Sequence, residues 1–366
     1  MLNILIVGLG LMGGSLACAL KKFGAESTIA GHDADPSVMR RALETGIVDR
    51  LEPEGFPGIA GYDLVFLAVP VGRIVSLARL LMGGMSPGSL LTDVGSVKEV
   101  IAREIRETLP EGIEYIGGHP MTGSEVQGLD GADPHLFENA VYVLTVDTDS
   151  DALVIARERL AGMLRSIGAL VVEMPAAIHD EIVTFVSHLP YVAAVSLVNV
   201  LKSRFPTVSE ALSLAAGGFH DCTRVAACTP DVFRDILAAN SDHVVAGIDQ
   251  LIQELRMTRD TLVEGRKDDL ESRLTRAREV RRTLPARHRA YPLAIFDLVV
   301  RAEDRPGFLG DLASLLGHHR INIKDFVLMQ VRPQEAGTIR LTFHREKDLQ
   351  EALGVLEEGG YRVTRR

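Results

Sequence analysis

The chain has 366 residues, which predicts two or three domains at roughly 150 residues per domain. Hydrophobic residues make up 46% of the chain and charged residues 24%, proportions of a folded globular protein that exclude a disordered or collagen-like chain. The 39 Lys and Arg residues are outnumbered by 49 Asp and Glu residues, and the formal net charge of −10 argues against nucleic acids and anionic membrane surfaces as partners.

Short apolar runs alternate with helical patterns over residues 1–174. The run LNILIV at residues 2–7 is followed by a glycine and is typical of a strand that is buried on both faces. Further strands are expected at residues 27–31, 63–69, 89–93, 115–117 and 140–146, and helices at residues 11–22, 36–44 and 97–108. This alternation predicts an α/β domain of the Rossmann type, with a parallel sheet covered on both faces.

Residues 175–286 lack such runs and are predicted to form an all-helical domain. Amphipathic patterns place its helices at residues 178–186, 190–202, 232–264 and 267–282. Their apolar faces exceed what one chain can bury, which favours a homodimer. The apolar stretch 189–201 has about thirteen residues where a membrane span needs ~20, and we interpret it as a buried core helix.

Residues 293–366 are predicted to form a third domain, after a break marked by Pro285 and Pro292. Its strands are expected at residues 295–301, 322–331, 338–344 and 361–364, its helices at residues 308–318 and 349–358, and a turn at residues 332–337. The order βαββαβ is that of a ferredoxin-like sandwich.

A glycine-rich turn, GLGLMG, follows the first predicted strand and opens the first predicted helix. In this context the spacing predicts a dinucleotide site. Gly8 allows the tight turn, Gly10 lets a pyrophosphate approach the backbone, and Gly13 permits close packing of helix and strand. Asp33, at the end of the second strand, can accept a hydrogen bond from a ribose 2′-OH, which favours NAD over NADP. The predicted cofactor contacts are Gly8, Gly10, Leu11, Met12, Gly13, Asp33, Val69 and Ser96.

Four polar motifs lie where predicted strands end or where helices of the second domain begin. They are DVGSVK at residues 93–98, GGHPMTGSE at 117–125, SHLP at 187–190 and GGFHDCTR at 217–224. Ligands of open α/β sheets bind at the carboxyl ends of the strands. Together with GLGLMGGS at the N-terminus, and in this order, the motifs resemble the prephenate dehydrogenase family over residues 1 to about 284. The tail, with EDRPG at residues 303–307, resembles an ACT domain, a module that senses small molecules.

The resemblance implies an NAD-dependent oxidative decarboxylation of prephenate to 4-hydroxyphenylpyruvate in L-tyrosine biosynthesis. The C4 hydrogen of the ring leaves as hydride, the C4 hydroxyl loses its proton, the ring carboxylate departs as CO₂, and aromatisation drives the reaction. His119 matches the family's catalytic histidine, and a neutral imidazole is an available base near pH 7. Ser96 matches the serine between cofactor and substrate hydroxyl, and it could also cap the helix that follows.

Four residues match positions where the family binds its substrate or lie close to them. Arg224 matches an arginine that pairs with a substrate carboxylate, for which its planar guanidinium is suited; the alternative is a structural ion pair. Lys98 is a second cation, unless its helix turns it outward. His188 and Tyr191 are expected to contact the substrate side chain. Tyr191 stands where many members carry a second histidine, which leaves arogenate, with an amino group in place of the keto group, as an alternative substrate.

The third domain is expected to bind a regulatory ligand through Asp304, Gly307 and Asn322. Backbone N–H groups of this turn could meet an amino-acid carboxylate at the start of a helix. The ACT resemblance implies feedback inhibition by L-tyrosine, and the alternative is a dimerisation module without a ligand. For the whole chain, the alternative is a non-catalytic sensor of NAD and an amino acid, which would leave His119 and Arg224 without a joint purpose.

Cysteine usage and the N-terminus bear on the cellular compartment. Cys18, Cys222 and Cys228 show no CxxC spacing, which excludes a disulfide framework and a cysteine-rich zinc site and is typical of the reducing cytosol. The N-terminal apolar run lacks a basic segment and has too many glycines for a signal peptide. We therefore predict a cytoplasmic protein without a metal site.

Overall fold

The computed structural model describes residues 2–24, 26–123, 126, 128–147, 151–205, 207, 211, 213–283, 296–303, 305–329, 337–343 and 345–365. These residues fall into two compact units, one that extends to Arg282 and one formed within residues 296–365. Pro285 and Pro292, which mark the predicted boundary, lie outside the described residues.

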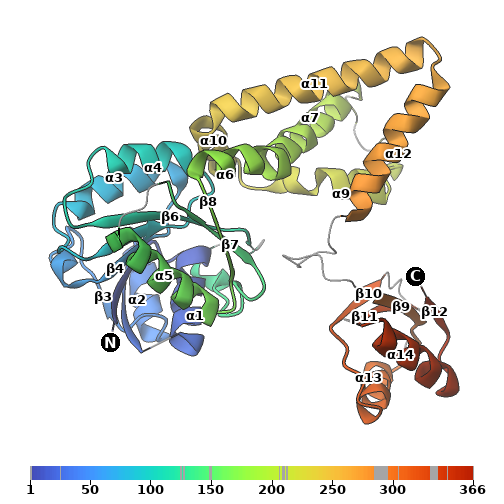
Figure 1. Ribbon diagram of the computed structural model, residues 1–366, viewed down its shortest axis with the longest axis horizontal. Helices are drawn as coiled ribbons and strands as arrows, with labels where there is room; N and C mark the ends of the chain where they lie inside the picture. Colours follow the sequence, from blue (N-terminus) through green and yellow to red (C-terminus); the bar gives the residue numbers. More distant parts are fainter. Residues whose placement is uncertain are drawn as a thin grey trace. The chain divides into compact units, whose positions relative to one another are not determined.

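A mixed β-sheet forms the centre of the first unit (Figure 1). Its strands are β1 (Leu2–Val7), β2 (Ser27–His32), β3 (Arg50–Leu51), β4 (Leu64–Leu67), β5 (Leu90–Asp93), β6 (Glu114–Pro120), β7 (Val141–Thr145) and β8 (Leu170–Met174). Among the described residues the strand order is β3-β2-β1-β4-β5-β6-β7-β8. The predicted α/β class is confirmed, but the expectation of an entirely parallel sheet is wrong at β7, which is antiparallel to β6.

The reversal at β7 has a simple cause in the connection before it. Parallel neighbours need a crossover, usually a helix, whereas antiparallel neighbours can follow one another directly. Between β6 and β7 the described chain has only a 3₁₀ turn, η2 (Leu129–Gly131), so it returns alongside β6 in the opposite direction. The helix α5 (Asp151–Ser166) then carries the chain back, and β8 lies parallel to β7.

Helices cover both faces of the sheet. They are α1 (Leu11–Phe23), α2 (Pro36–Glu44), α3 (Val71–Met82), α4 (Glu99–Arg106) and α5, with a short 3₁₀ turn η1 (Ile59–Gly61). Figure 1 shows α3 and α4 on one side of the sheet and α1, α2 and α5 on the other. Leu16 and Leu160 belong to the core on the α1 side, and Ile74 and Ile101 to the core on the α3 side. Burial on both faces explains why the central strands are continuous apolar runs.

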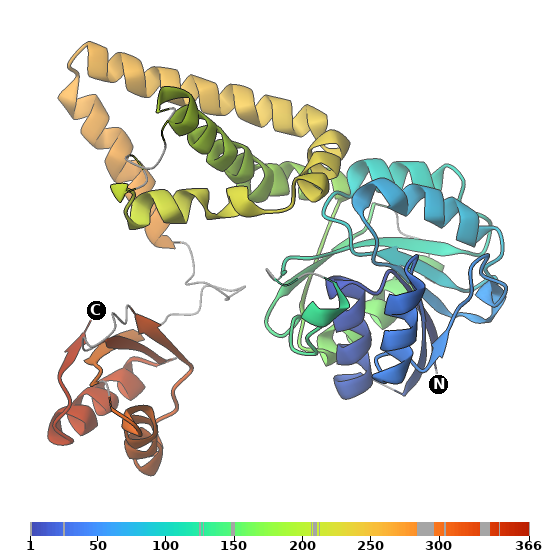
Figure 2. The same ribbon diagram turned by 180° about the vertical axis from the view of Figure 1, so that it is seen from behind.

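Between residues 176 and 283 the described residues are mainly helical, as predicted (Figure 2). Its elements are α6 (Ala176–Val183), the π-helical segment η3 (Thr184–His188), α7 (Leu189–Arg204), α9 (Gly217–Thr223), the 3₁₀ segment η4 (Arg224–Ala227), α10 (Pro230–Ala239), α11 (Ser241–Val263) and α12 (Lys267–Thr283). The helix predicted over residues 232–264 is in fact two helices. They meet at Asn240, whose backbone is not helical (φ −118°, ψ 29°).

The helix α7 is not the buried core helix that the sequence suggested. Only Tyr191 and Ala194 are buried along it, whereas Leu197 and Val200 are 49% and 65% exposed. With α6 and η3 it forms the stretch Ala176–Arg204, which is long and apolar enough by length and composition to cross a membrane. Only 28% of its most apolar window is buried. The single chain therefore exposes an apolar helical surface.

The second unit is the predicted βαββαβ domain. Its elements are β9 (Phe296–Arg301), α13 (Phe308–His318), β10 (Asp325–Met329), β11 (Thr338–Phe343), α14 (Glu346–Glu358) and β12 (Val363–Arg365). The strands pair antiparallel in the order β10-β11-β9-β12. Leu298, Leu316 and Phe343 belong to its separate core. Most of the predicted turn at residues 332–337 lies outside the described residues.

Candidate active site

The glycine-rich turn after β1 has the geometry that a dinucleotide requires. Gly8 has a φ of +95°, and a Cβ there would lie 2.2 Å from the carbonyl oxygen of Ala68. A Cβ on Gly13 would lie 1.9 Å from the carbonyl oxygen of Gly8. Packing therefore demands glycine at both positions. A Cβ on Gly10 would meet nothing within 4 Å, so the space in front of the α1 N-terminus is open, as a pyrophosphate needs.

The other predicted cofactor residues gather at the same edge of the sheet. The carboxylate of Asp33 accepts a 2.8 Å hydrogen bond from the backbone N–H of Leu9, inside the turn, and a 2.9 Å bond from that of Asp35. Each carboxylate oxygen can accept a further bond, so the ribose contact remains possible. Leu11 and Met12 form the first turn of α1, and Val69 lies within 3.0 Å of a Cβ placed on Gly8.

His119 lies near the carboxyl end of β6 and is the first member of a hydrogen-bonded array. Its Nδ1 atom is 2.8 Å from Nε2 of His179. The Nδ1 atom of His179 is 2.7 Å from Oδ1 of Asp180. His179 and Asp180 belong to α6 and are each 1% exposed, whereas His119 is half-buried. The array thus runs from the sheet edge into the interior of the first unit.

Asp180 is held by the start of α4. Its Oδ1 atom accepts a 2.8 Å hydrogen bond from the backbone N–H of Lys98, and its Oδ2 atom accepts one of 2.8 Å from Glu99. These donors lie at the N-terminus of a helix, where N–H groups lack intrahelical partners and the helix dipole favours a negative charge. Asp180 therefore joins α6 to α4 and ends the array at a fixed point.

The side chain of Lys98 is fully buried beneath the strand that carries His119. Its ammonium group forms an ion pair with Asp93 and donates a 2.9 Å hydrogen bond to the carbonyl oxygen of Gly118. Tyr115 donates a 2.7 Å hydrogen bond to the other oxygen of Asp93. Burial lowers the pKa of Lys98, against the opposing effect of the Asp93 and Asp180 carboxylates. This placement does not support the predicted contact between Lys98 and a substrate.

Two glycines before His119 make room for this buried network. A Cβ on Gly118 would lie 2.5 Å from the carbonyl oxygen of Asp93, and a Cβ on Gly117 would lie 2.5 Å from Oγ1 of Thr145. A Cβ atom does not approach other heavy atoms this closely, so a side chain at either position would push the strands apart. The sequence GGHP therefore keeps β6 close to β5 while it presents His119 at the edge of the sheet.

A second buried histidine, His188, ends the π-helical segment η3 and contacts Asn240. The Asn240 amide donates to the carbonyl oxygen of Asp180 at 3.1 Å and to Oγ1 of Thr184 at 2.9 Å, and it lies 3.1 Å from Nδ1 of His188. Tyr191 stacks on Phe233 of α10, with ring centroids 3.6 Å apart. His188 and Tyr191 are thus both packed against the chain segment 230–240.

Two of the histidines, His119 and His188, have a lowered pKa. Burial lowers the pKa of His119 well below its usual range, and electrostatic interactions with the neighbouring His179, Lys98 and His188 side chains lower it further. Burial lowers the pKa of His188 to about 4, although the Asp180 carboxylate opposes this effect. Both rings are therefore neutral near pH 7, as a general base must be.

The remaining predicted residues lie outside this array. Ser96 is half-buried in the loop after β5, at the carboxyl edge of the sheet. Arg224 begins η4, which packs against α7, and its side chain is exposed. In the second unit Gly307 has a φ of +85° and caps α13, while Asn322 is exposed before β10. Asp304 lies outside the described residues.

From the sequence, His179 fits the family's histidine pattern near the substrate, but nothing assigned a role in the site to Asp180 or to the two residues as a pair. The only signal was an adjacent histidine and aspartate on a predicted apolar helix, where charged residues are seldom buried without a partner. Nothing in the sequence shows that α6 packs on α4, because Asp180 and Lys98 are 82 positions apart. That long-range contact is what makes the pair part of the site.

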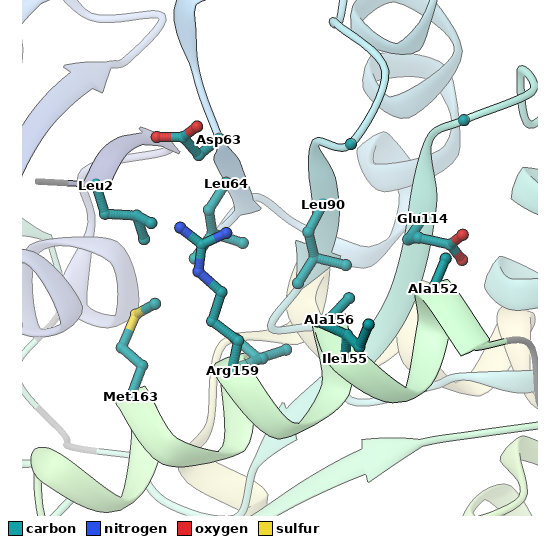
Figure 3. A pocket seen from close by; sticks show the side chains of 13 residues that line it. Leu2, Asp63, Leu64, Leu90, Glu114, Ala152, Ile155, Ala156, Arg159 and Met163 are labelled. Atoms are coloured by element: carbon teal, nitrogen blue, oxygen red, sulfur yellow. The ribbon is translucent and has the colours of Figure 1, made fainter.

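A cavity of about 420 Å³ lies at the opposite edge of the same sheet (Figure 3). It is bounded by the first residues of β1, β4, β5 and β6 and by α5. Figure 3 shows Leu90 opposite Ile155 and Ala156, and Leu2 on the side of Met163. Because ligands of open α/β sheets bind at the carboxyl ends of the strands, this apolar cavity is not the candidate active site.

A dinucleotide turn and a neutral histidine at one edge of a Rossmann-type sheet are features of nucleotide-dependent oxidoreductases. Models of known families match the chain in three consecutive parts. Residues 16–173 match "Prephenate dehydrogenase, nucleotide-binding domain", residues 175–276 match "Prephenate dehydrogenase, dimerization domain", and residues 296–358 match "ACT domain".

Individual relatives agree with these matches. A prephenate dehydrogenase of Bacillus subtilis (strain 168) is 33% identical over 359 residues, which are 97% of this chain and 95% of that protein. The chain belongs to the prephenate dehydrogenase family and is an oxidoreductase. The fold, with its Rossmann-like, helical and ACT parts, and the family suggested by the motifs are thereby confirmed.

Two solved structures resemble the first unit. The prephenate dehydrogenase of A. aeolicus, in complex with hydroxyphenyl propionate and NAD+, has a TM-score of 0.72 and 29% identity over 77% of this chain and 97% of that one. The arogenate dehydrogenase of Synechocystis has a TM-score of 0.67 and 28% identity over 76% of this chain and 98% of that one. Both substrates considered above therefore occur among proteins of this fold.

Proposed function

We propose that the chain catalyses the NAD-dependent oxidative decarboxylation of prephenate to 4-hydroxyphenylpyruvate, a step towards L-tyrosine. The observation that carries the proposal is His119, a neutral imidazole whose Nδ1 atom is engaged by His179 at the edge where the dinucleotide turn lies. The similarity to a prephenate dehydrogenase over almost the full length of both chains supports the choice of reaction.

The cofactor would be held by the turn that contains Gly8, Gly10 and Gly13, with its ribose on Asp33. The tight packing of Gly8 and Gly13 and the open space at Gly10 fit a pyrophosphate at the α1 N-terminus. NAD bound there would supply the acceptor for the hydride that leaves C4 of the substrate ring. Ser96, in the loop after β5, would lie between the nicotinamide and the C4 hydroxyl.

His119 would remove the proton from the C4 hydroxyl. The electron pair left on oxygen forms the carbonyl that replaces the C4–H bond. When the ring carboxylate departs as CO₂, the electron pair of the broken C–C bond enters the ring and restores aromaticity, and the C4 oxygen takes the proton back from His119 to become the phenol. A well-placed general base contributes about 10²–10⁴-fold to the rate. The lowered pKa keeps the ring unprotonated near neutral pH, so the base is ready without prior loss of a proton.

The two carboxylates of prephenate need cationic or hydrogen-bonding partners. We assign one of them to Arg224, whose guanidinium can bind a carboxylate through two parallel bonds. His188 and Tyr191 would contact the substrate side chain from η3 and α7. Tyr191 can donate a hydrogen bond but cannot become cationic. The presence of Tyr191 at this position is the reason why arogenate is a second candidate substrate.

A comparison of substrates with a matched variant tests the proposal. The purified full-length chain is assayed for NADH or NADPH formation with prephenate and with arogenate, each with NAD and with NADP. We expect prephenate with NAD to be turned over fastest. The variant His119→Asn should lose at least about a hundredfold in kcat, in line with loss of a general base, while its NAD affinity stays unchanged.

The outcomes separate the candidates. Faster turnover of arogenate would identify arogenate as the substrate and Tyr191 as the residue that selects it. Turnover of neither substrate by a chain that binds NAD would contradict the proposed reaction. Near-normal kcat in His119→Asn would remove His119 from its role as base and leave the reaction itself in place.

We also propose an oligomeric state, a cellular location and an effector for the protein. The exposed apolar residues of α6 and α7 support a homodimer, and the cysteine usage, without CxxC spacing, supports a cytoplasmic location. L-tyrosine is the effector we propose for the ACT domain. A cavity of about 430 Å³ beside the loop that precedes α13, lined in part by Arg305, Phe308 and Tyr361, offers a cation for a carboxylate and rings for an aromatic side chain.

A further inference from the structure

His179 and Asp180 have no assigned part in the reaction, yet the array from His119 ends on them. Both side chains are almost wholly buried, and their partners are fixed: Asp180 by two backbone N–H groups of the α4 start, His179 by Asp180 and His119. Buried polar groups are normally hydrogen-bonded, but a chain of this kind also determines which atom carries each proton.

The proton positions follow from the fixed end of the array. Both oxygens of Asp180 accept backbone N–H groups, so the proton between Asp180 and His179 belongs to Nδ1 of His179. A neutral imidazole has one donor and one acceptor nitrogen, and Nε2 of His179 is therefore the acceptor. It must take its hydrogen from Nδ1 of His119. The lone pair of His119 is then on Nε2, the atom left for the substrate.

We propose that His179 and Asp180 are positioning residues that hold His119 in the tautomer with a protonated Nδ1 and a basic Nε2, and that stabilise the imidazolium formed when His119 accepts the substrate proton. The inference rests on the proposed function, in which His119 is the base. The proton moves from the C4 hydroxyl to Nε2 of His119, and the Nδ1 hydrogen stays shared with His179. Asp180 stabilises the positive charge through His179 without taking a proton itself.

The surroundings of His119 make this support necessary. Lys98 before α4 and His188 at the end of η3 both act against a positive charge on His119, and burial acts in the same direction. Asp93 on β5 is paired with Lys98. Asp180 is thus the carboxylate that reaches His119 through a hydrogen-bonded path, and without it no negative charge would be linked to the protonated ring.

Three variants separate positioning from a purely structural role. In Asp180→Asn an oxygen remains for the backbone N–H groups of α4, but the negative charge is gone. In His179→Gln the amide can accept from His119 and donate to Asp180, which preserves the tautomer. In His179→Leu neither bond is possible. Thermal unfolding and NAD titration of each full-length variant show whether fold and cofactor site are intact.

We expect His179→Leu and Asp180→Asn to lose at least about a hundredfold in kcat with little change in KM for prephenate, as for a base held in the wrong tautomer. The variant His179→Gln should recover at least about tenfold of the loss in His179→Leu. The acidic limb of the kcat profile should move to lower pH in Asp180→Asn, because the imidazolium loses its carboxylate. An unmoved limb, or kcat of His179→Leu within threefold of the parent, would overturn the proposal.

A measurement without substrate keeps this test independent of the proposed reaction. In the ¹⁵N-histidine-labelled resting protein at pH 8, with signals assigned through His119→Asn and His179→Gln, we expect Nδ1 of His119 to be protonated and Nε2 to be unprotonated. The opposite tautomer would contradict the array even if prephenate were turned over. The expected tautomer in a chain that turns over no prephenate would leave the array in place and refute the reaction instead.

Discussion

At the scale of single residues, the buried pair of Lys98 and Asp93 sets the position of His119. Lys98 bonds to the carbonyl oxygen of Gly118, one residue before His119, and Asp93 bonds to Tyr115 on the same strand. The pair therefore fixes β6 from below at two points. A charge pair of this kind contributes little net stability, but removal of one partner leaves an uncompensated buried charge.

The substitution Lys98→Met tests this arrangement. It keeps the length of the side chain but leaves Asp93 without its cation, and we expect a loss of about 3–5 kcal/mol in the free energy of unfolding. Urea unfolding of the full-length variant measures the loss. The double variant Lys98→Met with Asp93→Asn is the matched control and should regain part of it. A loss below about 1 kcal/mol in the single variant would show that water or another group compensates Asp93.

The sequence predicts a site residue when a local pattern fixes its position, and it fails when a contact between distant segments does so. His119, Asp93 and Ser96 follow predicted strands, and the rule that ligands bind at the carboxyl ends of strands places them at one edge from sequence alone. The direction of the Lys98 side chain could not be foreseen, because one residue's shift at the α4 start decides between interior and surface. The contribution of His179 depends on the contact between α6 and α4, which no local pattern encodes.

At the scale of elements, the π-helical segment η3 (Thr184–His188) brings the second histidine into the interior. Pro190 has no N–H to donate and cannot continue a regular helical ladder through this region. The backbone N–H of Leu189 bonds instead to the carbonyl oxygen of Thr184, one residue further back than in an α-helix. Asn240 donates to the carbonyl oxygen of Asp180. The irregular turn carries His188 against Asn240, a common use of π-bulges at functional sites.

The buried His188 makes the stability of the protein fall in mild acid. In the unfolded chain a histidine takes up a proton near pH 6.5, whereas in the folded protein burial holds the pKa of His188 at about 4. Its stabilising effect is therefore complete above pH 6.5 and is lost as the pH falls from 6.5 towards 4. The loss is at most about 3 kcal/mol for this group.

Urea unfolding at pH 7.5, 6.5, 5.5 and 4.5 measures this dependence, with His188→Gln as the control. Glutamine can still accept a bond from Asn240 but does not titrate, so the variant should lose stability with falling pH less steeply, by up to about 1.4 kcal/mol per pH unit. His119 and the carboxylates contribute equally to the pH dependence of unfolding in both proteins, so the difference between the two slopes reports on His188. Identical slopes in the two proteins would mean that folding does not lower the pKa of His188.

Element boundaries followed the sequence where local signals were strong. Helix α2 begins at Pro36 with an Asp35 cap, and α13 runs over 308–318 as predicted. The split of the predicted helix 232–264 at Asn240 was missed, because an apolar periodicity continues across the break. The break is associated with a tertiary contact. The backbone of Asn240 is not helical, and its side-chain amide donates hydrogen bonds to Asp180 of α6 and Thr184 of η3.

At the scale of the whole molecule, the two units have cores without a shared residue. The dinucleotide turn, the histidine array and Arg224 all belong to the first unit, and the ACT domain belongs to the second. Any control of the reaction by an effector bound to the ACT domain is therefore a coupling between units, and it requires that the effector bind one state of the protein more tightly than another.

Removal of residues 291–366 tests this coupling. The separate cores predict that the truncated chain folds, keeps its turnover of prephenate within a few-fold and loses its inhibition by L-tyrosine. Initial rates of NADH formation over a range of tyrosine concentrations measure both properties. Inhibition that persists in an active truncated chain would place tyrosine at the catalytic cleft, where it would compete with the substrate.

Two glycine substitutions in the full-length chain locate the effect within the ACT domain. Gly307 has a φ of +85° before α13, so Gly307→Ala strains the loop beside the proposed effector site and should raise the tyrosine concentration needed for half-inhibition. Gly310 lies in α13, and a Cβ there would meet nothing within 4 Å. The variant Gly310→Ala should therefore be inhibited like the parent. Equal sensitivity of all three proteins would exclude the start of α13 from effector binding, because strain at a contact point must weaken the bound state.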